Sequence, residues 1–163
     1  MHAGNLGLSQ NLESVVGAAG DLLDLPDLVL VFRRRGRQRN PRSGQSRGIG
    51  ASTNVQFLLA PSRSAISSNT FAAADCFVVS LMAGLSGFIV PSKLYGILAA
   101  GRPHVAAMES DSEAKHIAER EGCGLVADPG SPESIAGQIR ALYLNRDLTR
   151  QMGERAREAR AAI

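Results

Sequence analysis

The sequence predicts one α/β domain built on a Rossmann-like, doubly wound parallel sheet. Short apolar runs of strand length alternate with segments whose apolar residues recur every three or four positions, a pattern typical of strands joined by helices. Glycine and proline stand at the ends of these segments, where they start and stop helices. Apolar residues make up 44% of the 163 residues, which is enough for one sizeable core.

The first helix is predicted over residues 10–25, with Ser9 as its N-cap and Pro26 ending it. Its apolar face is formed by Leu12, Val15, Val16, Ala19, Leu22 and Leu23. Residues 28–32 follow as a continuous apolar run, which predicts a strand buried on both faces. Residues 33–53 then show neither the apolar period of a helix nor that of a strand, and they are rich in Arg, Gly and Ser.

The alternation resumes at residue 55, and residues 71–74 are predicted to be the end of a helix. Strands are predicted over residues 55–58, 76–80, 104–108 and 124–127. Helices are predicted over residues 91–100 and 111–121 and from Pro132 and Asp147 onward. Pro91 opens the first of these helices, Gly101 stops it, and Ser131 caps the helix that begins with Pro132. Right-handed crossovers join such elements into a parallel sheet, which binds ligands at the carboxyl ends of its strands.

The net charge of +3 conceals an uneven distribution. No Asp or Glu occurs between residues 28 and 74, and eight arginines do: Arg33, Arg34, Arg35, Arg37, Arg39, Arg42, Arg47 and Arg63. Three explanations of residues 33–53 remain open: a reading-frame shift in the gene, a patch that binds nucleic acid or anionic lipid, and a disordered insert. Nucleic acid is the less favoured partner, because no aromatic residue for base stacking stands between Arg33 and Gln56.

Two glycine segments are candidates for binding phosphate. Residues 4–7 (GNLG) precede the first helix, where glycine lets the backbone approach a ligand closely and free N–H groups face it. Residues 84–87 (GLSG) are followed by Ser92, a hydroxyl donor, and by Lys93 in the first turn of a helix, where the helix dipole disfavours a cation. Plain turns and a solvated lysine are the alternatives.

Three segments resemble bacterial family 4 glycosyltransferases, in particular the branch that builds surface polysaccharides. They are residues 4–10 (GNLGLSQ), 91–103 (PSKLYGILAAGRP) and 122–126 (GCGLV). The similarity covers residues 1–32 and about 71–160. It implies a GT-B fold, in which two Rossmann-like domains enclose a cleft, and it makes residues 1–163 the C-terminal, nucleotide-sugar-binding half. The acceptor-binding N-terminal domain is expected to be absent, so that transfer by the chain alone is expected to be weak or lacking.

The resemblance also implies roles for the candidate residues. Gly4, Asn5 and Gly7 would face the donor diphosphate, and Ser92 and Lys93 would hold its oxygens. The loop with Gly84, Ser86 and Gly87 would border the sugar. No metal is expected, because side chains and helix ends neutralise the charge, and no cofactor besides the nucleotide-sugar substrate. The implied reaction transfers the sugar, with retention at the anomeric carbon, to a glycan or lipid-linked acceptor.

The sequence departs from the family pattern at a Glu-x7-Glu motif, whose positions here are Phe88 and Gly96. Neither residue can bind a ribose hydroxyl through its side chain, and Glu113 in the next helix is the candidate substitute. His104 and His116 are interpreted as structural or solvated residues, and Cys76 and Cys123 as small buried residues. The alternatives to a donor-binding domain are an arginine-rich polyanion-binding fragment and a non-functional remnant.

The N-terminal residues lack the basic and apolar regions of a secretory signal. A cytoplasmic location is therefore expected, which includes the inner face of the membrane if the acceptor is lipid-linked.

Overall fold

The protein is described from a computed structural model that places residues 2–3, 11–35, 53–60, 71–85 and 92–162. Its strands form two parallel three-stranded sheets. The first sheet contains β1 (His2–Ala3), β2 (Leu30–Arg35) and β3 (Val55–Ala60). The second contains β4 (Phe77–Ser80), β5 (His104–Ala107) and β6 (Gly124–Ala127).

The two sheets meet where β1 lies beside β4. β1 also pairs with β2, with His2 opposite Phe32, and β4 pairs with β5, with Phe77 opposite His104. The strands of the described residues therefore follow the order β3-β2-β1-β4-β5-β6. This is the order of a doubly wound Rossmann sheet, in which the direction of the connections reverses between β1 and β4.

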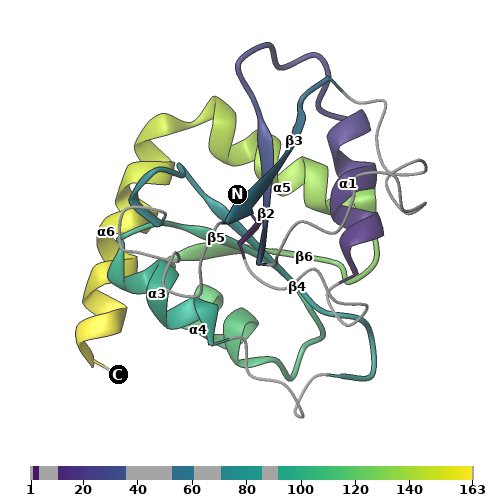
Figure 1. The fold of residues 1–163 in the computed structure, drawn as a ribbon. Coiled ribbons are helices and arrows are strands. Elements are labelled where there is room, and N and C mark those ends of the chain that lie inside the picture. Colours follow the sequence, from purple (N-terminus) through teal and green to yellow (C-terminus); the bar gives the residue numbers. More distant parts are fainter. Residues whose placement is uncertain (1, 4–10, 36–52, 61–70, 86–91, 163) are drawn as a thin grey trace.

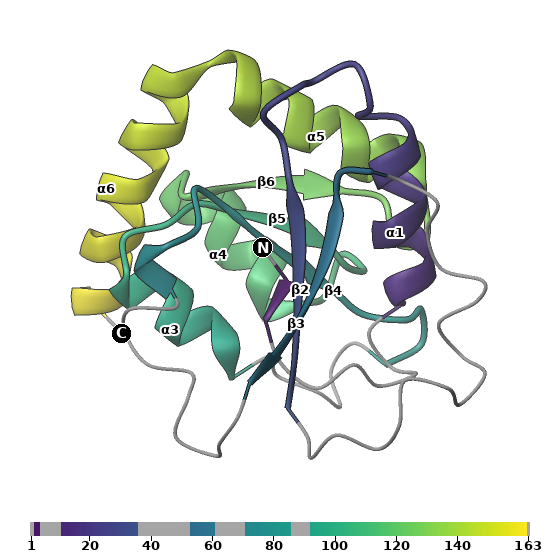
Figure 2. The same ribbon diagram turned by 45° about the horizontal axis from the view of Figure 1, so that its top comes forward.

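Helices cover both faces of this sheet, as Figures 1 and 2 show. One face carries α1 (Leu12–Gly20) and α5 (Pro132–Leu144). The other carries α3 (Lys93–Ala99) and α4 (Glu113–Glu121), while α6 (Arg146–Ala162) runs along the side of the molecule and reaches both cores. The predicted fold class is confirmed.

Alternating residues of the buried strands divide between the two cores. In β4, Val78 packs in the core under α1 and α5, while Phe77 and Val79 pack in the core under α3 and α4. β5 shows the same alternation with Val105 and Ala106. Such two-sided burial is why these strands are continuous apolar runs in the sequence.

Local signals start and stop several helices as predicted. Ser131 accepts a hydrogen bond from the Ser134 N–H (3.1 Å), ahead of Pro132 at the start of α5. After α3, Gly101 adopts φ +64° and its N–H donates to the Leu98 carbonyl (2.9 Å). The Arg102 N–H then donates to the Ile97 carbonyl (3.2 Å), which completes a glycine C-cap.

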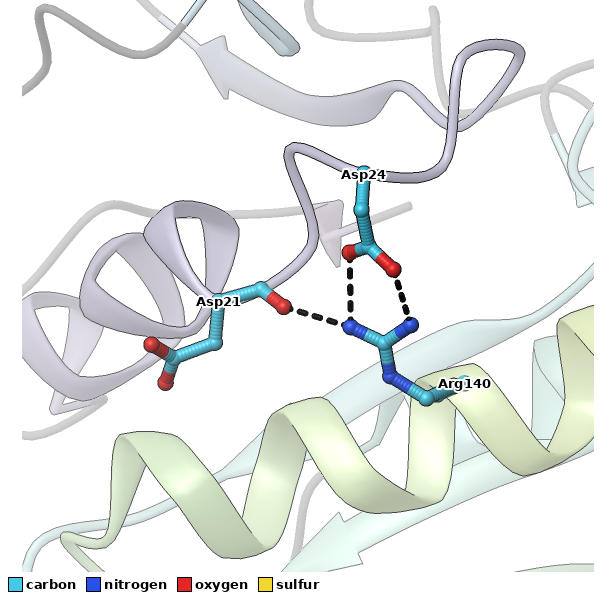
Figure 3. Close-up of polar contacts among 3 residues, drawn as sticks. All are labelled: Asp21, Asp24 and Arg140. Carbon is cyan, nitrogen blue, oxygen red and sulfur yellow. Dashed lines mark hydrogen bonds and ion pairs between the residues drawn. The ribbon is translucent and has the colours of Figure 1, made fainter.

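A bidentate ion pair joins the two helices of one face. Arg140 of α5 donates to both carboxylate oxygens of Asp24 (2.5 and 2.7 Å), in the turn after α1. The same guanidinium donates to the Asp21 carbonyl (2.7 Å), while the Asp21 carboxylate points away (Figure 3). The side-chain hydrogen bond from Arg140 is the main cause that lowers the pKa of Asp24.

Several predicted boundaries were wrong. α1 ends at Gly20 instead of residue 25, because Gly20 is a poor helix former and successive turns follow, with Leu25 donating to the Leu22 carbonyl (3.2 Å). These turns still bury Leu22 and Leu25, which explains the misleading apolar period. The helix predicted from Pro91 begins at Lys93.

A further error concerns the arginine segment, in which we expected the strand to end at residue 32. The backbone of Arg33, Arg34 and Arg35 continues β2, opposite Leu58, Leu59 and Ala60 of β3. Pairing with β3, and at Arg33 also with β1, decides the conformation here, against what the side-chain pattern indicates. Residues 36–52 lie outside the described residues, so the three explanations of the segment stay predictions.

No helix among the described residues has the length and apolar character needed to cross a bilayer.

Candidate functional site

The candidate site lies at the carboxyl ends of β1 and β4, where the strand order reverses. β1 ends at Ala3, immediately before the predicted segment that contains Gly4, Asn5 and Gly7. β4 ends at Ser80, four residues before Gly84. The fold therefore brings the starting points of both predicted glycine segments to the same edge of the sheet. Gly4, Asn5, Gly7, Ser86 and Gly87 themselves lie outside the described residues.

Gly84 is held by a contact that the sequence analysis missed. Its backbone has φ +80°, a conformation that favours glycine, and its N–H donates to the Glu109 Oε2 atom (2.9 Å). Glu109 follows the end of β5 by two residues and thus stands at the same edge of the sheet. Its carboxylate joins the loop after β4 to the loop after β5. The position of an acidic residue directly after a buried strand was the available signal.

Lys93 is the cation of the candidate site. It is the first residue of α3 and is partly buried, and this burial lowers the pKa of its ammonium group to about 8. At pH 7 the group is still charged, but the fold disfavours that charge. A bound anion would stabilise the charged ammonium group, which burial has deprived of solvation by water. This environment therefore suits a lysine that binds a negatively charged ligand.

Ser92 precedes Lys93 with an exposed side chain. Although Ser92 occupies the N-cap position of α3, its hydroxyl makes no capping hydrogen bond to the helix. The hydroxyl is therefore not used for the role that serine most often has at this position.

Glu113, the predicted substitute for a ribose-binding acid, begins α4 and accepts a hydrogen bond from the Tyr95 hydroxyl (2.9 Å). This hydrogen bond raises the pKa of Tyr95. The contact connects α3 with α4 through one carboxylate oxygen and leaves the second oxygen of Glu113 outside that bond.

The structure also explains the glycine at the second position of the family's acidic motif. A Cβ atom added at Gly96 would lie 2.9 Å from Cζ of Phe71, which is closer than real Cβ atoms approach. Phe71 in turn packs on Phe77 of β4, with ring centroids 5.4 Å apart. A glutamate at position 96 would therefore require this aromatic pair to move.

The histidines are placed as predicted. His104 is fully buried, its Nε2 lies 3.1 Å from the Ala114 carbonyl, and burial lowers its pKa. His116 is exposed on α4. Both cysteines are free, Cys123 buried and Cys76 partly buried. Within the described ranges no three His, Cys, Asp or Glu residues gather as metal ligands would.

A separate groove lies at the other end of the sheet. A groove of about 270 Å³ opens at the amino ends of β2 and β4, and the residues that line it include Leu28, Leu30 and Cys76. It is at the opposite end of the sheet from Gly84 and Lys93. Sheet topology and charge therefore locate the candidate site.

Comparison with known proteins adds a family and a fold. A model of the family described as "Glycosyl transferases group 1" matches residues 1–159. The putative colanic acid biosynthesis glycosyl transferase WcaI of Escherichia coli K12 is 32% identical over 146 residues, which are 88% of this chain and 35% of WcaI. This chain thus spans about a third of the length of that relative.

Solved structures share the fold at low identity. Anabaena HepE in complex with UDP superposes with a TM-score of 0.76 at 16% identity, over 99% of this chain and 43% of HepE. The C-terminal domain of a glycosyl transferase group 1 family protein (LpcC) from Francisella tularensis gives a TM-score of 0.75 at 14% identity, over 99% of this chain and 83% of that domain. The fold is therefore that of the C-terminal half of a GT-B protein.

Proposed function

Because this chain belongs to the group 1 glycosyltransferases, we propose that it binds the nucleoside diphosphate part of a nucleotide sugar at the carboxyl ends of β1 and β4. The observation that carries the proposal is that β1 and β4, which lead into the two predicted glycine segments, lie side by side where the strand order reverses. In open α/β sheets, ligands bind in this crevice.

Charge supports a diphosphate as the ligand. Lys93 stands nine residues after Gly84, and burial disfavours its ammonium charge, so a diphosphate would stabilise the charged form. Ser92 offers a hydroxyl that does not cap α3. The two glycine segments would donate backbone N–H groups to the diphosphate and let the backbone approach it closely. Their residues are Gly4, Asn5, Gly7, Ser86 and Gly87.

A uridine nucleotide is the first donor to test. HepE, which shares the fold, was crystallised with UDP and with UDP-glucose. At 16% identity this likeness is a reason to test a uridine nucleotide first. It does not identify the base or the sugar that this chain binds.

The proposed reaction is transfer of the sugar from this donor, with retention, to a glycan or a lipid-linked acceptor at the inner face of the membrane. This chain would contribute the donor half of the site and stabilise the departing nucleoside diphosphate through Lys93 and backbone N–H groups. We propose that no metal takes part. Since the chain spans 35% of WcaI, the acceptor would be bound by parts of a full-length transferase that this chain does not contain.

Isothermal titration calorimetry with UDP and GDP tests the proposal, on protein whose cooperative thermal unfolding shows that it is folded. Lys93→Gln should weaken nucleotide binding by about tenfold, because a charge-assisted hydrogen bond is lost. Lys115→Gln is the matched control, since Lys115 is the other lysine of the chain and lies on α4. Absence of binding heat from the folded protein, or equal weakening by both substitutions, would contradict the proposal.

A further inference from the structure

The imidazole of His104 attaches helix α4 to strand β5. The ring is fully buried, and its Nε2 atom lies 3.1 Å from the Ala114 carbonyl oxygen in the first turn of α4. A carbonyl oxygen can only accept a hydrogen bond, so in the neutral ring Nε2 carries the proton and Nδ1 does not. His104 therefore holds the start of α4 through an N–H that the sheet donates.

The second ring nitrogen of His104 lies in a tightly filled place. Among the described residues its Nδ1 atom is buried and has no hydrogen-bond partner. A Cβ atom added at Gly124, which is opposite His104 in β6, would lie 3.1 Å from both Nδ1 and Cε1. This edge of the ring is thus pressed against Gly124. A second proton, on Nδ1, would find no acceptor in the part of the chain that the structure describes.

The surroundings of the ring disfavour a charged imidazole. Burial lowers the pKa of His104, the hydrogen bond to Ala114 opposes this effect, and a neighbouring charge is not among the causes. Phe77 of β4 is opposite His104 in register, and burial raises the pKa of the Cys123 thiol before β6 to about 11, so this thiol is neutral. The charged and titratable side chains of the neighbouring helices are Lys93 of α3, Glu113, Lys115, His116 and Glu121 of α4, and Arg155 of α6.

Helix α4 has little apolar area that fixes it to the sheet. Its buried apolar residues are Ala114, Ile117 and Ala118. The Cys123 thiol adds one contact, which it donates to the Ile117 carbonyl at 3.6 Å. Strand β5, by contrast, pairs with β4 on one side and with β6 on the other. Segments with few buried apolar contacts open locally at a lower free energy than the centre of a sheet, so α4 opens more easily than β5.

The start of α4 also reaches the edge of the sheet that carries the candidate site. Glu113, its first residue, accepts a hydrogen bond from the Tyr95 hydroxyl of α3 (2.9 Å). In the turn before α4, the Glu109 carboxylate accepts from the Gly84 N–H, and the Glu109 carbonyl accepts from the Ser112 N–H (3.1 Å). A displacement of α4 would therefore move both carboxylates.

We infer that α4 separates locally from the sheet, that a second proton on His104 favours this open form, and that opening disturbs the candidate site. In the open form the ring reaches water and has its ordinary pKa of 6.5, whereas in the closed form burial keeps it neutral. At pH 5.5 the exposed ring is protonated about ten to one, so opening is favoured about tenfold over pH 7.5. The link to the candidate site rests on the proposed function, and the pH dependence of opening does not.

Amide hydrogen exchange of the whole chain at pH 7.5 and pH 5.5, corrected for the intrinsic effect of pH, measures the opening. The readouts are the N–H groups of Ile117 and Ala118 in α4, with those of Val105 and Ala106 in β5 as the reference. The α4 groups should exchange faster than the β5 groups at both pH values, and 0.5 M urea should hardly change their exchange, as expected of a local opening. Their protection should fall by about tenfold from pH 7.5 to pH 5.5.

His104→Gln supplies the decisive comparison. Its side-chain amide can donate to the Ala114 carbonyl but takes up no proton, so α4 protection should change by less than about twofold between the two pH values. His116→Gln, on the exposed face of α4, is the matched control and should keep the tenfold loss. Equal exchange of the α4 and β5 groups, or equal pH dependence in His104→Gln and the unchanged protein, would overturn the inference.

The His104 Cε1–H resonance of the unchanged protein gives an answer even if His104→Gln does not fold. The ring should remain neutral at pH 6.5 while α4 is closed, because burial lowers its pKa. An imidazole that takes up its second proton at pH 6.5 or above, while α4 keeps its protection, would overturn the inference.

UDP tests the link between α4 and the candidate site. If the nucleotide binds only the closed form, UDP at 100 times its Kd should slow the exchange of Ile117 and Ala118 by about hundredfold. Unchanged exchange in the presence of UDP that calorimetry shows to be bound would overturn the link. Absence of UDP binding would instead contradict the proposed function, and the pH dependence of opening would still be decided by His104→Gln.

Discussion

The carboxylate of Glu109 accepts a hydrogen bond from the N–H of Gly84 at 2.9 Å and thereby joins the loops that follow β5 and β4. Twenty-five residues separate the two in sequence. The contact fixes the backbone of the loop that approaches the proposed nucleotide, at the position where Gly84 has φ +80°.

Glu109→Ala should therefore weaken UDP binding, by about three- to tenfold, because a net hydrogen bond of about 1 kcal/mol holds the loop in place. Glu109→Gln keeps an acceptor oxygen and should retain most of the affinity. Glu119→Ala on the exposed surface of α4 is the control for loss of negative charge. Calorimetry that finds the same affinity for Glu109→Ala and the unchanged protein would show that this contact does not position the loop.

The pKa of Lys93 predicts a pH dependence of binding. A bound diphosphate favours the charged ammonium group, so affinity should fall as pH rises through about 8. Lys93→Arg keeps its charge throughout this range and should show little change between pH 7 and pH 9.5. If both proteins lose affinity equally over this range, the titrating group is not Lys93.

The same pKa has the opposite consequence for folding of the nucleotide-free protein. Burial lowers the pKa from 10.5 to about 8, so between these values the unfolded chain binds more protons than the folded one. The Lys93 contribution to the free energy of unfolding should therefore rise with pH across this window. Comparison of urea unfolding of the unchanged protein with Lys93→Met, at pH 7 and pH 9.5, measures it. A Lys93 contribution that stays constant or falls with pH would contradict the assignment.

How far local signals determined this structure can be judged from three places. Ser131 and Pro132 were predicted correctly because a cap and a first helical position are decided by residues a few positions apart. Arg33, Arg34 and Arg35 were misjudged because their strand conformation depends on pairing with residues 25 positions away. Glu109 was missed for the same reason, since only the parallel sheet brings it to Gly84.

Gly96→Ala should destabilise the fold by about 1–3 kcal/mol, because the added methyl group would contact the Phe71 ring at 2.9 Å in a packed core. Gly137→Ala is the matched control within a helix. Nothing lies within 4 Å of a Cβ atom at Gly137, and this substitution should stabilise α5 by about 0.5–1 kcal/mol. Urea unfolding measures both, and destabilisation of equal size in the two variants would contradict the steric explanation.

The ion pair of Arg140 with Asp24 should contribute modestly to stability, because both side chains are accessible to solvent. Arg140→Met should lower the melting temperature at low salt, and the difference from the unchanged protein should shrink in 1 M NaCl. The lowered pKa of Asp24 means that this contribution is present above about pH 4 and is lost as pH falls further. Arg150→Met, which removes a more exposed pair with Asp147, should have a smaller effect, and a larger one would contradict the ranking.

A titration with UDP followed by backbone amide NMR tests the central claim most directly, because it locates the nucleotide on the fold. The account predicts chemical-shift changes that concentrate at Gly84, Ser92 and Lys93, at the carboxyl ends of β1 and β4, and leave Val31 and Cys76 at the other end of the sheet unchanged. Shifts concentrated at Val31 and Cys76, or no shifts at any UDP concentration up to about 100-fold excess, would contradict it.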